Sequence, residues 1–346
     1  MKTSSPGLVR GSAARRARRG APIAVLVACV AALFVLVLAS VAIGSNPLSL
    51  GEAWRGLVHV DDSRASIIVW QLRMPRTALA ILVGVALAVA GVMMQALTRN
   101  PLAEPGLLGV NAGAAFAVVM GISFLGITST SILVWFALAG AGAAAGFVYV
   151  ISVRRSRPGD HARLVLAGAA LSASLAACTG VITMFDTDAF SSYRFWVIGS
   201  VADRGLEPLF AVLPLIITGL VAAAITAPAL NALALGDEQA TALGVPLPLV
   251  RVLAFASIAL LCGAATAVAG PIAFVGLVVP HALRLLLGVD QRVVLAFSIL
   301  AGPILVLGSD IVGRVVARPG ELEVGIVTAF VGAPVLIALI LRKGTR

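Results

Sequence analysis

The chain has 346 residues, of which 60% are hydrophobic and only 12% are charged, and its mean hydropathy is +1.07. A water-soluble fold cannot bury that much apolar surface, so the composition indicates a polytopic helical membrane protein. The long uninterrupted apolar runs exclude a transmembrane β-barrel, whose strands alternate in polarity. The formal net charge is +10, but a basic cluster lies in the first 19 residues, directly before an apolar run. We interpret this cluster as a topology signal that holds the N-terminus in the cytoplasm, rather than as a nucleic-acid-binding patch.

The hydropathy pattern predicts about ten membrane spans, with both termini in the cytoplasm. The first apolar run follows a basic tail (residues 1–20) and is longer than the roughly 7–15 residues of a secretory signal core, so we expect an uncleaved helix. Most Lys and Arg residues fall on the predicted inner segments, which supports this orientation. Residues 21–346 are predicted to form a single transmembrane domain. The expected spans are residues 21–43, 76–98, 107–124, 131–153, 164–185, 208–230, 250–270, 271–287, 293–311 and 324–341.

The second span is bounded by features that a simple membrane anchor does not need. Arg73 and Arg76 flank Pro75 at its predicted outer end, after a polar outer connection over residues 44–69. Arginines at a span end ordinarily extend their charge toward the interface. Two of them beside a proline, on the side where positive charge is disfavoured, favour contact with an acidic partner. Arg314, at the outer end of the ninth span, is a third candidate.

Two parts of the chain resemble each other. Residues 84–110 align with residues 263–289, and the matched pairs include Pro101 with Pro280. The two copies begin on spans of opposite predicted direction. We therefore expect an inverted repeat of the kind found in transporters, over about residues 73–185 and 250–341.

The sequence lacks the residues that ATP chemistry requires. A phosphate-binding loop needs glycines that lead into Lys-Ser/Thr, but the only lysines are Lys2 and Lys343, and neither has this context. Any ATP-driven work therefore needs a separate subunit. Cys29, Cys178 and Cys262 lie in separate apolar spans, and no metal site, disulfide, cofactor or catalytic constellation is predicted. The carboxylates are expected at span ends and in loops, which disfavours a proton-coupled secondary carrier.

The longest polar stretch on the inner side, residues 231–248, is predicted to contain a short exposed helix. Asp237 and Glu238 favour the positive N-terminus of this helix, Gly244 suits the position after its end, and Pro246 prevents its continuation. A helix this short is marginal in water. It is therefore expected to pack either on its own protein or on a cytoplasmic partner.

Several motifs together resemble the FecCD-type permease family, the membrane subunits of ABC importers for iron–siderophore complexes, haem and vitamin B12. The motifs cover nearly the whole chain after the basic tail: residues 70–76 (WQLRMPR), 99–109 (RNPLAEPGLLG), 196–200 (WVIGS), 235–244 (LGDEQATALG), 270–281 (GPIAFVGLVVPH), 310–314 (DIVGR) and 325–334. The positions of these motifs for which we expect structural roles are Asn100, Pro101, Glu104, Pro105, Gly106, Gly270, Pro271, Pro280 and His281.

The resemblance implies an all-α, ten-helix membrane protein of the type II ABC importer permease kind, located in the inner (cytoplasmic) membrane. It implies a second permease subunit, either a copy or a paralogue, around a central pathway, together with cytoplasmic ATPase subunits and an extracytoplasmic binding protein. Arginines that match Arg73, Arg76 and Arg314 pair in the family with acidic residues of that binding protein. The stretch that docks in the ATPase cleft corresponds here to Leu235, Gly236, Asp237, Glu238, Gln239, Ala240, Leu243 and Gly244.

One position departs from the family pattern. The family usually has Glu-Leu-Pro before the last span, whereas this chain has Glu321-Leu322-Glu323. The change leaves the start of that span open and adds a carboxylate near the docking surface. His281 is conceivable as a haem or iron ligand, but a lone histidine after a helix-distorting proline more often makes a local hydrogen bond.

We therefore expect a transport subunit, not an enzyme, that moves a chelated-iron complex into the cytoplasm with energy from a partner ATPase. Vitamin B12 and haem are the alternative cargoes. A secondary carrier driven by an ion gradient is an alternative of another class, and a membrane scaffold without transport is a third. The sequence carries no readable code for the cargo.

Overall fold

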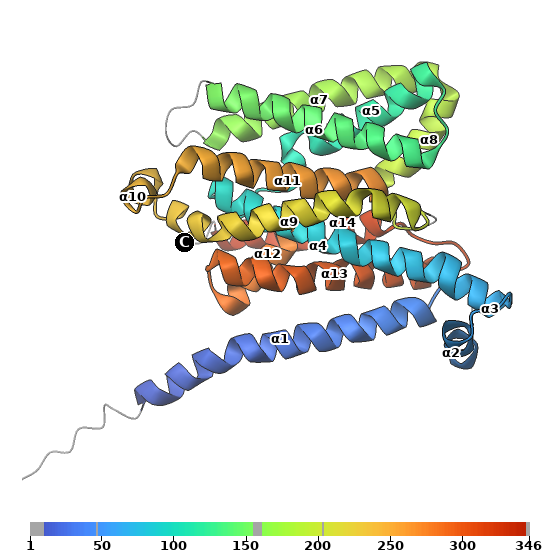
Figure 1. The fold of residues 1–346 in the computed structure, drawn as a ribbon, viewed down its shortest axis with the longest axis horizontal. Coiled ribbons are helices and arrows are strands. Elements are labelled where there is room, and N and C mark those ends of the chain that lie inside the picture. The colour runs from blue at the N-terminus through green and yellow to red at the C-terminus, as the bar shows by residue number, and fades with distance from the viewer. Residues whose placement is uncertain (1–9, 46–47, 155–160, 203, 344–346) are drawn as a thin grey trace, which may run out of the picture.

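A computed structural model of the protein describes residues 10–45, 48–154, 161–202 and 204–343. Within these ranges the chain is helical and has no strand (Figure 1). Lys2, in the predicted basic tail, lies outside the described residues. The helices are α1 (Arg10–Ala42), α2 (Leu50–Val58), α3 (Arg64–Ile67), η1 (Ile68–Arg73), α4 (Met74–Thr98), η2 (Pro105–Leu108), α5 (Val110–Leu125), α6 (Thr130–Arg154), α7 (His161–Phe185), α8 (Thr187–Ile198), α9 (Glu207–Leu233), α10 (Asp237–Ala242), α11 (Leu247–Ala269), α12 (Val275–Leu287), α13 (Gln291–Val316) and α14 (Val324–Lys343).

The long helices run side by side between two ends of the molecule (Figure 1). The short helix α10 and the C-terminal end of the chain lie at one end, and α2, α3 and α8 lie at the other. We call these the inner and the outer end, because α10 belongs to the predicted cytoplasmic stretch and α2 to the predicted outer connection. This arrangement agrees with the topology that the charge pattern predicts.

The apolar helices of the described chain follow the predicted membrane spans in order. Seven helices of the described chain are long and apolar enough to cross a membrane, and α5, α12 and the apolar part of α14 are shorter apolar helices. A helix of 13 residues such as α12 rises only about 20 Å, less than the roughly 30 Å of a hydrocarbon core. α12 therefore does not cross the bilayer alone, and the non-helical residues 270–274 lead into it.

Helix α4 forms the centre of the fold, with α9 and α11 on one side and α12 and α13 on the other (Figure 1). Of the most apolar 18 residues in the helical segment that contains α4, 83% are buried. The corresponding buried share is only 6% in α1 and 11% in α7, which lie at opposite margins of the bundle. Gly91 permits the close crossing of α4 and α12, because a Cβ atom there would lie 2.0 Å from the carbonyl oxygen of Gly276. Close packing between small residues stabilises helix–helix contacts in lipid, where the hydrophobic effect does not drive helices together.

The helix that contains the second span begins earlier than the sequence predicted. The expected polar connection over residues 44–69 contains α2 and α3, and α3, η1 and α4 form one continuous helical segment from Arg64. Ser63 starts this segment, since its hydroxyl accepts a hydrogen bond from the Ser66 N–H at 3.3 Å. Pro75 cannot donate a backbone hydrogen bond, and the wider π-helical turn η1 directly before it accommodates this loss.

The two halves of the predicted repeat differ in local structure at the aligned positions. Helix α4 continues to Thr98, whereas α11 ends at Ala269 and Gly270 takes a positive φ of 72°. Pro101 therefore lies in a turn, and its aligned partner Pro280 lies inside α12. The inverted repeat remains a prediction. The last span begins at Val324, directly after the altered Glu321–Glu323 segment, as the hydropathy pattern predicted.

Candidate functional sites at the two ends of the bundle

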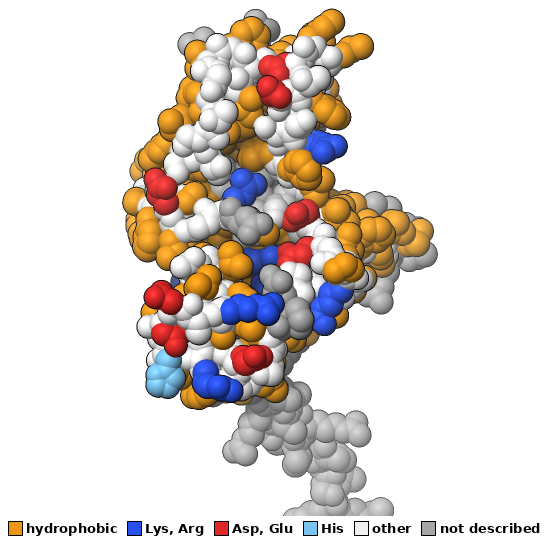
Figure 2. Space-filling model, turned by 90° about the vertical axis from the view of Figure 1, so that its right-hand side faces the viewer, with side chains coloured by type: hydrophobic (Ala, Val, Ile, Leu, Met, Phe, Trp, Pro, Cys, Tyr) orange, Lys and Arg blue, Asp and Glu red, His pale blue; other side chains and the backbone are white. Residues whose placement is uncertain are grey.

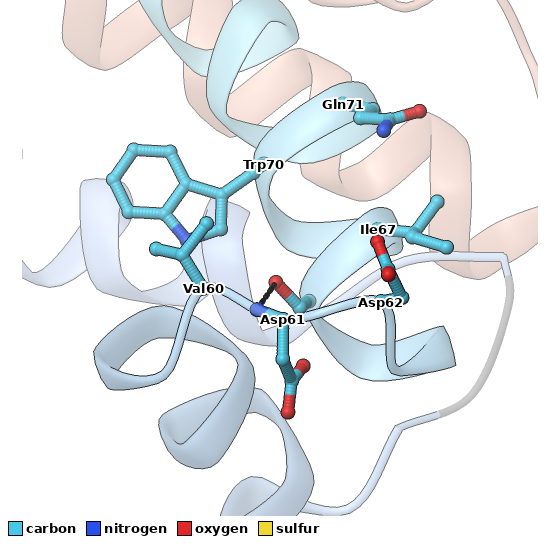
Figure 3. Close-up of a pocket in the computed structure, with 7 residues that line it drawn as sticks. Val60, Asp61, Asp62, Ile67, Trp70 and Gln71 are labelled. Carbon is cyan, nitrogen blue, oxygen red and sulfur yellow. Dashed lines mark hydrogen bonds between the residues drawn. The ribbon is translucent and has the colours of Figure 1, made fainter.

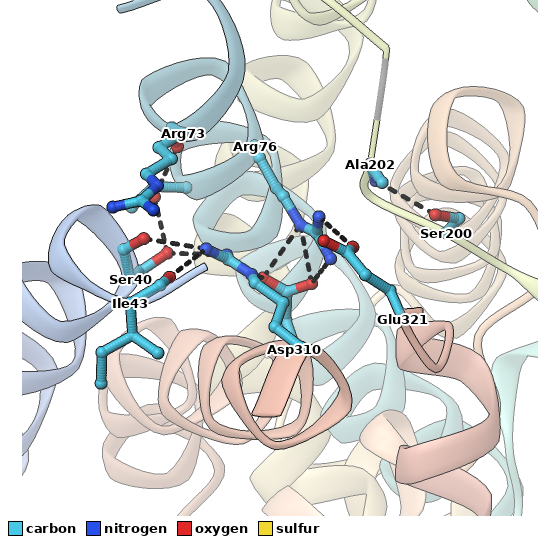
Figure 4. Close-up of polar contacts among 10 residues, drawn as sticks. Ser40, Ile43, Arg73, Arg76, Ser200, Ala202, Asp310 and Glu321 are labelled. Atoms are coloured by element: carbon cyan, nitrogen blue, oxygen red, sulfur yellow. Dashed lines mark hydrogen bonds and ion pairs between the residues drawn. The ribbon is translucent and has the colours of Figure 1, made fainter. Parts of the chain in front are cut away.

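A buried carboxylate organises the outer end of the bundle. Asp310 of α13 has no exposed side-chain surface and accepts hydrogen bonds from the guanidinium groups of Arg76 and Arg314 (Figure 4). Arg76 donates to Asp310 Oδ1 from Nη2 at 2.7 Å and from Nε at 2.9 Å. Its Nη1 donates to Glu321 at 2.5 Å. Arg76 therefore links α4 to α13 and to the loop before α14.

Arg314 and Arg73 bind the C-terminal end of α1. Arg314 Nη1 donates to the carbonyl oxygens of Ser40 at 2.8 Å and Ile43 at 3.0 Å. Arg73 Nη1 donates to the carbonyl oxygens of Val41 and Ala42, each at 2.8 Å. The last carbonyl groups of a helix lack intrahelical partners and carry partial negative charge, so guanidinium groups suit this position. The two arginines thereby attach the peripheral helix α1 to the core.

The three arginines predicted to dock a binding protein thus lie together in one cluster, which the sequence did not reveal. Arg73 and Arg314 are only 4% and 1% exposed, and all three have partners within the chain. A cavity of about 190 Å³ is lined by Arg73, Arg76, Arg314 and Glu321. Direct pairing with an external carboxylate requires some of the internal bonds to be exchanged, and the docking role remains a prediction. Figure 2 shows this end of the molecule, where charged side chains gather between hydrophobic flanks.

The inner end carries the predicted coupling helix. Helix α10 spans Asp237–Ala242, and Gly244 follows it with a φ of 80°, which confirms the predicted helix end. Ala240 is fully buried against the chain's own helices, whereas the flanking Leu235 and Leu243 are 59% and 66% exposed. Helix α10 therefore packs on its own protein through one face and leaves apolar side chains free beside it.

Asp237 ties α10 to two core helices. It accepts a hydrogen bond from Arg251 of α11 at 2.6 Å, and its other oxygen pairs with Arg99 at the end of α4. Arg99 takes the left-handed conformation (φ 51°) that terminates α4. Burial alone would raise the pKa of Asp237, but the hydrogen bonds and charges of Arg251 and Arg99 lower it below its ordinary value. Asp237 therefore stays ionised at neutral pH.

A second polar chain crosses the inner half of the bundle. Gln95 of α4 donates to the Gly276 carbonyl oxygen at 3.0 Å and accepts from Arg284 of α12. Asn231 of α9 accepts from the Gln291 N–H at 2.8 Å and donates to Asp290, also at 2.8 Å. These bonds connect α4 with α12 and α9 with α13, and Arg284 joins the two pairs by donating to Gln291 at 3.4 Å near the end that carries α10.

The central motifs meet inside the bundle rather than at its surface. Glu104, in the turn after α4, accepts the backbone N–H of Phe274 at 2.5 Å, immediately before α12 begins. Asn100 closes the same turn, because its side-chain oxygen accepts the Leu102 N–H at 3.0 Å. Pro105 lies against Gly276, because a Cβ atom added to Gly276 would be 2.8 Å from the Cδ atom of Pro105. The turn over residues 100–106 and the segment over residues 270–276 thus support each other.

The same segment is held from the outer side by the motif at residues 196–200. The Ser200 N–H donates to the Ala269 carbonyl oxygen at 2.7 Å, and a Cβ on Gly270 would lie 2.2 Å from the Trp196 carbonyl oxygen. Pro271 follows Gly270 in the same non-helical stretch. Gly106 faces Asn111, because a Cβ atom added to Gly106 would be 2.8 Å from the side-chain amide nitrogen of Asn111. In the described chain these positions contact other parts of the same protein, and their structural role remains a prediction.

His281 follows Pro280 within α12 and is half-buried. Among the residues that the structure describes, no three His, Cys, Asp or Glu side chains lie close enough together to hold a metal ion. The role of His281 remains a prediction.

The sequence analysis missed the acidic partners at both ends. Asp310 and Arg314 are four residues apart in one helix, a spacing that indicates an ion pair. The bonds from Arg76 to Asp310 and Glu321, and from Arg99 to Asp237, join residues more than 100 positions apart. No local pattern indicates such pairs.

The comparisons with known proteins agree with this architecture. The model of the FecCD transport family matches residues 32–342. The chain is 44% identical to the ferric enterobactin transport system permease protein FepD of Escherichia coli K12, over 90% of this chain and 94% of FepD. It is 39% identical to the vitamin B12 import system permease protein BtuC of Yersinia enterocolitica, over 90% of this chain and 91% of BtuC.

A haem-related relative and a solved structure extend the similarity. The hemin transport system permease protein HmuU of Yersinia pestis is 36% identical, over 90% of this chain and 93% of HmuU. A solved inward-facing ABC transporter described as of metal-chelate type superposes with a TM-score of 0.80 and 29% identity, over 92% of this chain and 98% of that one. The resemblance inferred from the motifs is therefore confirmed. The chain belongs to the FecCD transport family and is a multi-pass inner-membrane permease of the ABC importer type.

Proposed function

We propose that this permease carries an iron–siderophore complex into the cytoplasm. The single observation that supports this cargo most strongly is the 44% identity to a ferric enterobactin permease across nearly the whole of both chains. The iron arrives enclosed in its chelator, so the permease needs no metal ligands of its own. The chain itself moves the cargo, and ATP hydrolysis takes place in separate ATPase subunits.

Vitamin B12 and haem are the alternative cargoes, because relatives that carry these names are 39% and 36% identical over similar lengths. Uptake into proteoliposomes that contain the whole importer distinguishes them. We expect a radiolabelled ferric siderophore to accumulate, and unlabelled haem or cobalamin not to compete with it. Accumulation of labelled haem or labelled cobalamin, with no accumulation of any ferric siderophore tested, assigns the cargo to that alternative instead.

The ATPase subunits are proposed to dock at α10. Its exposed neighbours Leu235 and Leu243 offer apolar contact, and Glu238 and Gln239 are exposed on the helix itself. Because Asp237 bonds to Arg99 and Arg251, a displacement of α10 acts directly on the inner ends of α4 and α11. This connection gives closure of the ATPase subunits a route to the centre of the bundle.

The binding protein is proposed to dock at the outer end through the cluster of Arg73, Arg76 and Arg314. The cavity among these arginines and the partial exposure of Glu321 support this placement. Carboxylates of the docked protein would compete with Glu321 for Arg76 Nη1. A second permease subunit, either a copy or a paralogue, completes the pathway.

A secondary carrier remains the rival from another class. Glu104 is a carboxylate of the central motifs, and it accepts the Phe274 N–H before α12. Protonation of Glu104 would weaken this hydrogen bond, so a proton-carrying role would loosen the start of α12. The ATP-driven alternative requires no such step.

A further inference from the structure

Helix α2 is a well-formed surface helix at the outer end, although it has only nine residues. Its first turn carries a capping box: the Ser49 hydroxyl accepts the Glu52 N–H at 3.3 Å, and the Glu52 carboxylate accepts the Ser49 N–H at 2.7 Å. This reciprocal pair satisfies two backbone donors that would otherwise lack partners. The helix therefore has a fixed start and a defined set of faces.

One face of α2 is fixed to the protein. A Cβ on Gly56 would lie 2.7 Å from the backbone of Ala65, so α2 and α3 approach backbone to backbone. The Trp70 indole N–H donates to the Gly56 carbonyl oxygen at 3.1 Å. Figure 3 shows Trp70 directed toward the segment after α2, beside a cavity of about 370 Å³ that also borders Asp61 and Asp62. These contacts fix the rotational orientation of α2 about its own axis.

A second face of α2 is apolar and uncovered. Leu50, Trp54 and Val58 follow each other at four-residue intervals, which places them in one stripe along the helix. Their exposed fractions are 79%, 65% and 54%. The charged side chains Glu52 and Arg55 lie on the remaining face. The apolar surface of α2 therefore includes side chains that the rest of the protein does not cover.

We propose that this stripe is inserted in the outer leaflet of the membrane, with α2 lying in the plane of the interface. Helix α2 begins eight residues after α1 ends, and it lies beside the outer end of α1 at the margin of the bundle (Figure 1). Helix α1 is a membrane span whose apolar side chains, among them Val27, Phe34 and Leu38, face outward. The stripe of α2 therefore lies next to a helix whose exposed apolar side chains suit contact with lipid.

The chemistry of the stripe suits insertion in the outer leaflet of the membrane. A short helix with an apolar stripe beside charged residues lies parallel to the membrane at the boundary between headgroups and acyl chains. Tryptophan is enriched at that depth, because its ring is apolar and its N–H remains near water. Glu52 and Arg55 keep their charges on the aqueous side of the helix. Since Trp70 belongs to η1, which ends at Arg73, the lipid contact of α2 also steadies the helix that carries the outer cluster.

Site-directed spin labelling tests this placement on the full chain in lipid nanodiscs. Cys29 and Cys178 are replaced by alanine, the buried Cys262 is retained, and one label is introduced by Trp54→Cys or by Arg55→Cys. Both positions are exposed and adjacent in α2, so Arg55→Cys is the matched control. Collisions with apolar oxygen, which concentrates in lipid, are compared with collisions with a water-soluble nickel chelate.

The ratio of oxygen to nickel collisions is expected to be several-fold higher at position 54 than at position 55. Equal ratios at the two positions, with high nickel collision rates, would place the stripe in water and overturn the proposal. A label at position 54 that is shielded from both reagents would show that protein, such as a second copy of the chain, covers the stripe instead. Elution as a single species in detergent, compared with the unlabelled chain, verifies that each variant is folded.

Discussion

Arg76 and Asp310 are 234 positions apart in the chain, yet the Arg76 guanidinium donates two hydrogen bonds to one oxygen of the Asp310 carboxylate, the shorter at 2.7 Å. The pair joins the first turn of α4 to α13 at the outer end, and Glu321 extends it to the loop before α14. Any movement that separates α4 from α13 at this end must break these bonds. The cluster is therefore both a structural joint and the surface on which docking is proposed.

Asp310→Asn should destabilise the protein strongly. The substitution removes the charge that Arg76 and Arg314 share, and breaking a buried ion pair by removing one partner costs about 3–5 kcal/mol. Thermal unfolding in detergent measures the effect. Glu321→Gln is the matched comparison, because Glu321 contacts Arg76 but is partly exposed, and it should lower the unfolding temperature much less. Equal losses in the two variants would contradict the central position of Asp310.

Glu321→Gln should strengthen docking of an acidic binding protein. Without the carboxylate, Arg76 Nη1 loses its internal ionic partner and becomes available to a partner's carboxylate. The gain in affinity should be larger at low salt than at high salt, because the new contact is electrostatic. Binding of the purified protein to immobilised permease measures this. The control is Glu323→Gln, which neutralises a carboxylate two residues away, and the same gain in that variant would argue against a specific exchange at Arg76.

Asp237→Asn should uncouple transport from ATP hydrolysis. The variant loses the charge that pairs with Arg99 and Arg251, so a displacement of α10 passes less directly to α4 and α11. We expect the ATPase subunits to remain bound while cargo uptake per ATP hydrolysed falls several-fold. Asp237→Glu retains the charge and should restore most of the coupling. Normal coupling in Asp237→Asn would exclude the ion pairs as the connection, and loss of ATPase binding would point to a docking role.

Gly91→Ala should weaken the core, because its Cβ would lie 2.0 Å from the Gly276 carbonyl oxygen. Overpacking of this kind costs about 1–3 kcal/mol. Gly142→Ala, in α6, is the control, since a Cβ there meets nothing within 4 Å, and alanine favours a helix by up to about 1 kcal/mol over glycine. Unfolding temperatures should therefore move in opposite directions, and a stable Gly91→Ala variant would contradict the close crossing of α4 and α12.

Hydropathy and charge were sufficient to predict the spans, because each span is a long local pattern that the membrane imposes. The end of α10 was equally readable from Gly244 and Pro246, whose backbone preferences are local. The early start of the second helix at Arg64 was missed, because residues 44–69 are more polar than a span and the π-turn before Pro75 leaves no distinct pattern.

The site was predictable only in part. The sequence indicated Arg73, Arg76 and Arg314 as unusual charges at span ends, but not that they share Asp310 and the carbonyl groups of α1. Those partners come from segments that only the fold brings together. Similarly, Asp237 was recognised as a favourable residue for a helix N-terminus, whereas its bonds to Arg99 and Arg251 depend on the packing of α4 beside α11.

The most direct test of the central claim is the energy source for uptake by the purified chain. The permease is reconstituted into proteoliposomes with its ATPase subunits and binding protein, and accumulation of a labelled ferric siderophore is followed. Uptake should require ATP and all three components, and it should persist when ionophores collapse the proton and sodium gradients. Uptake by the permease alone, driven by such a gradient without ATP, would contradict an ABC importer and identify a secondary carrier.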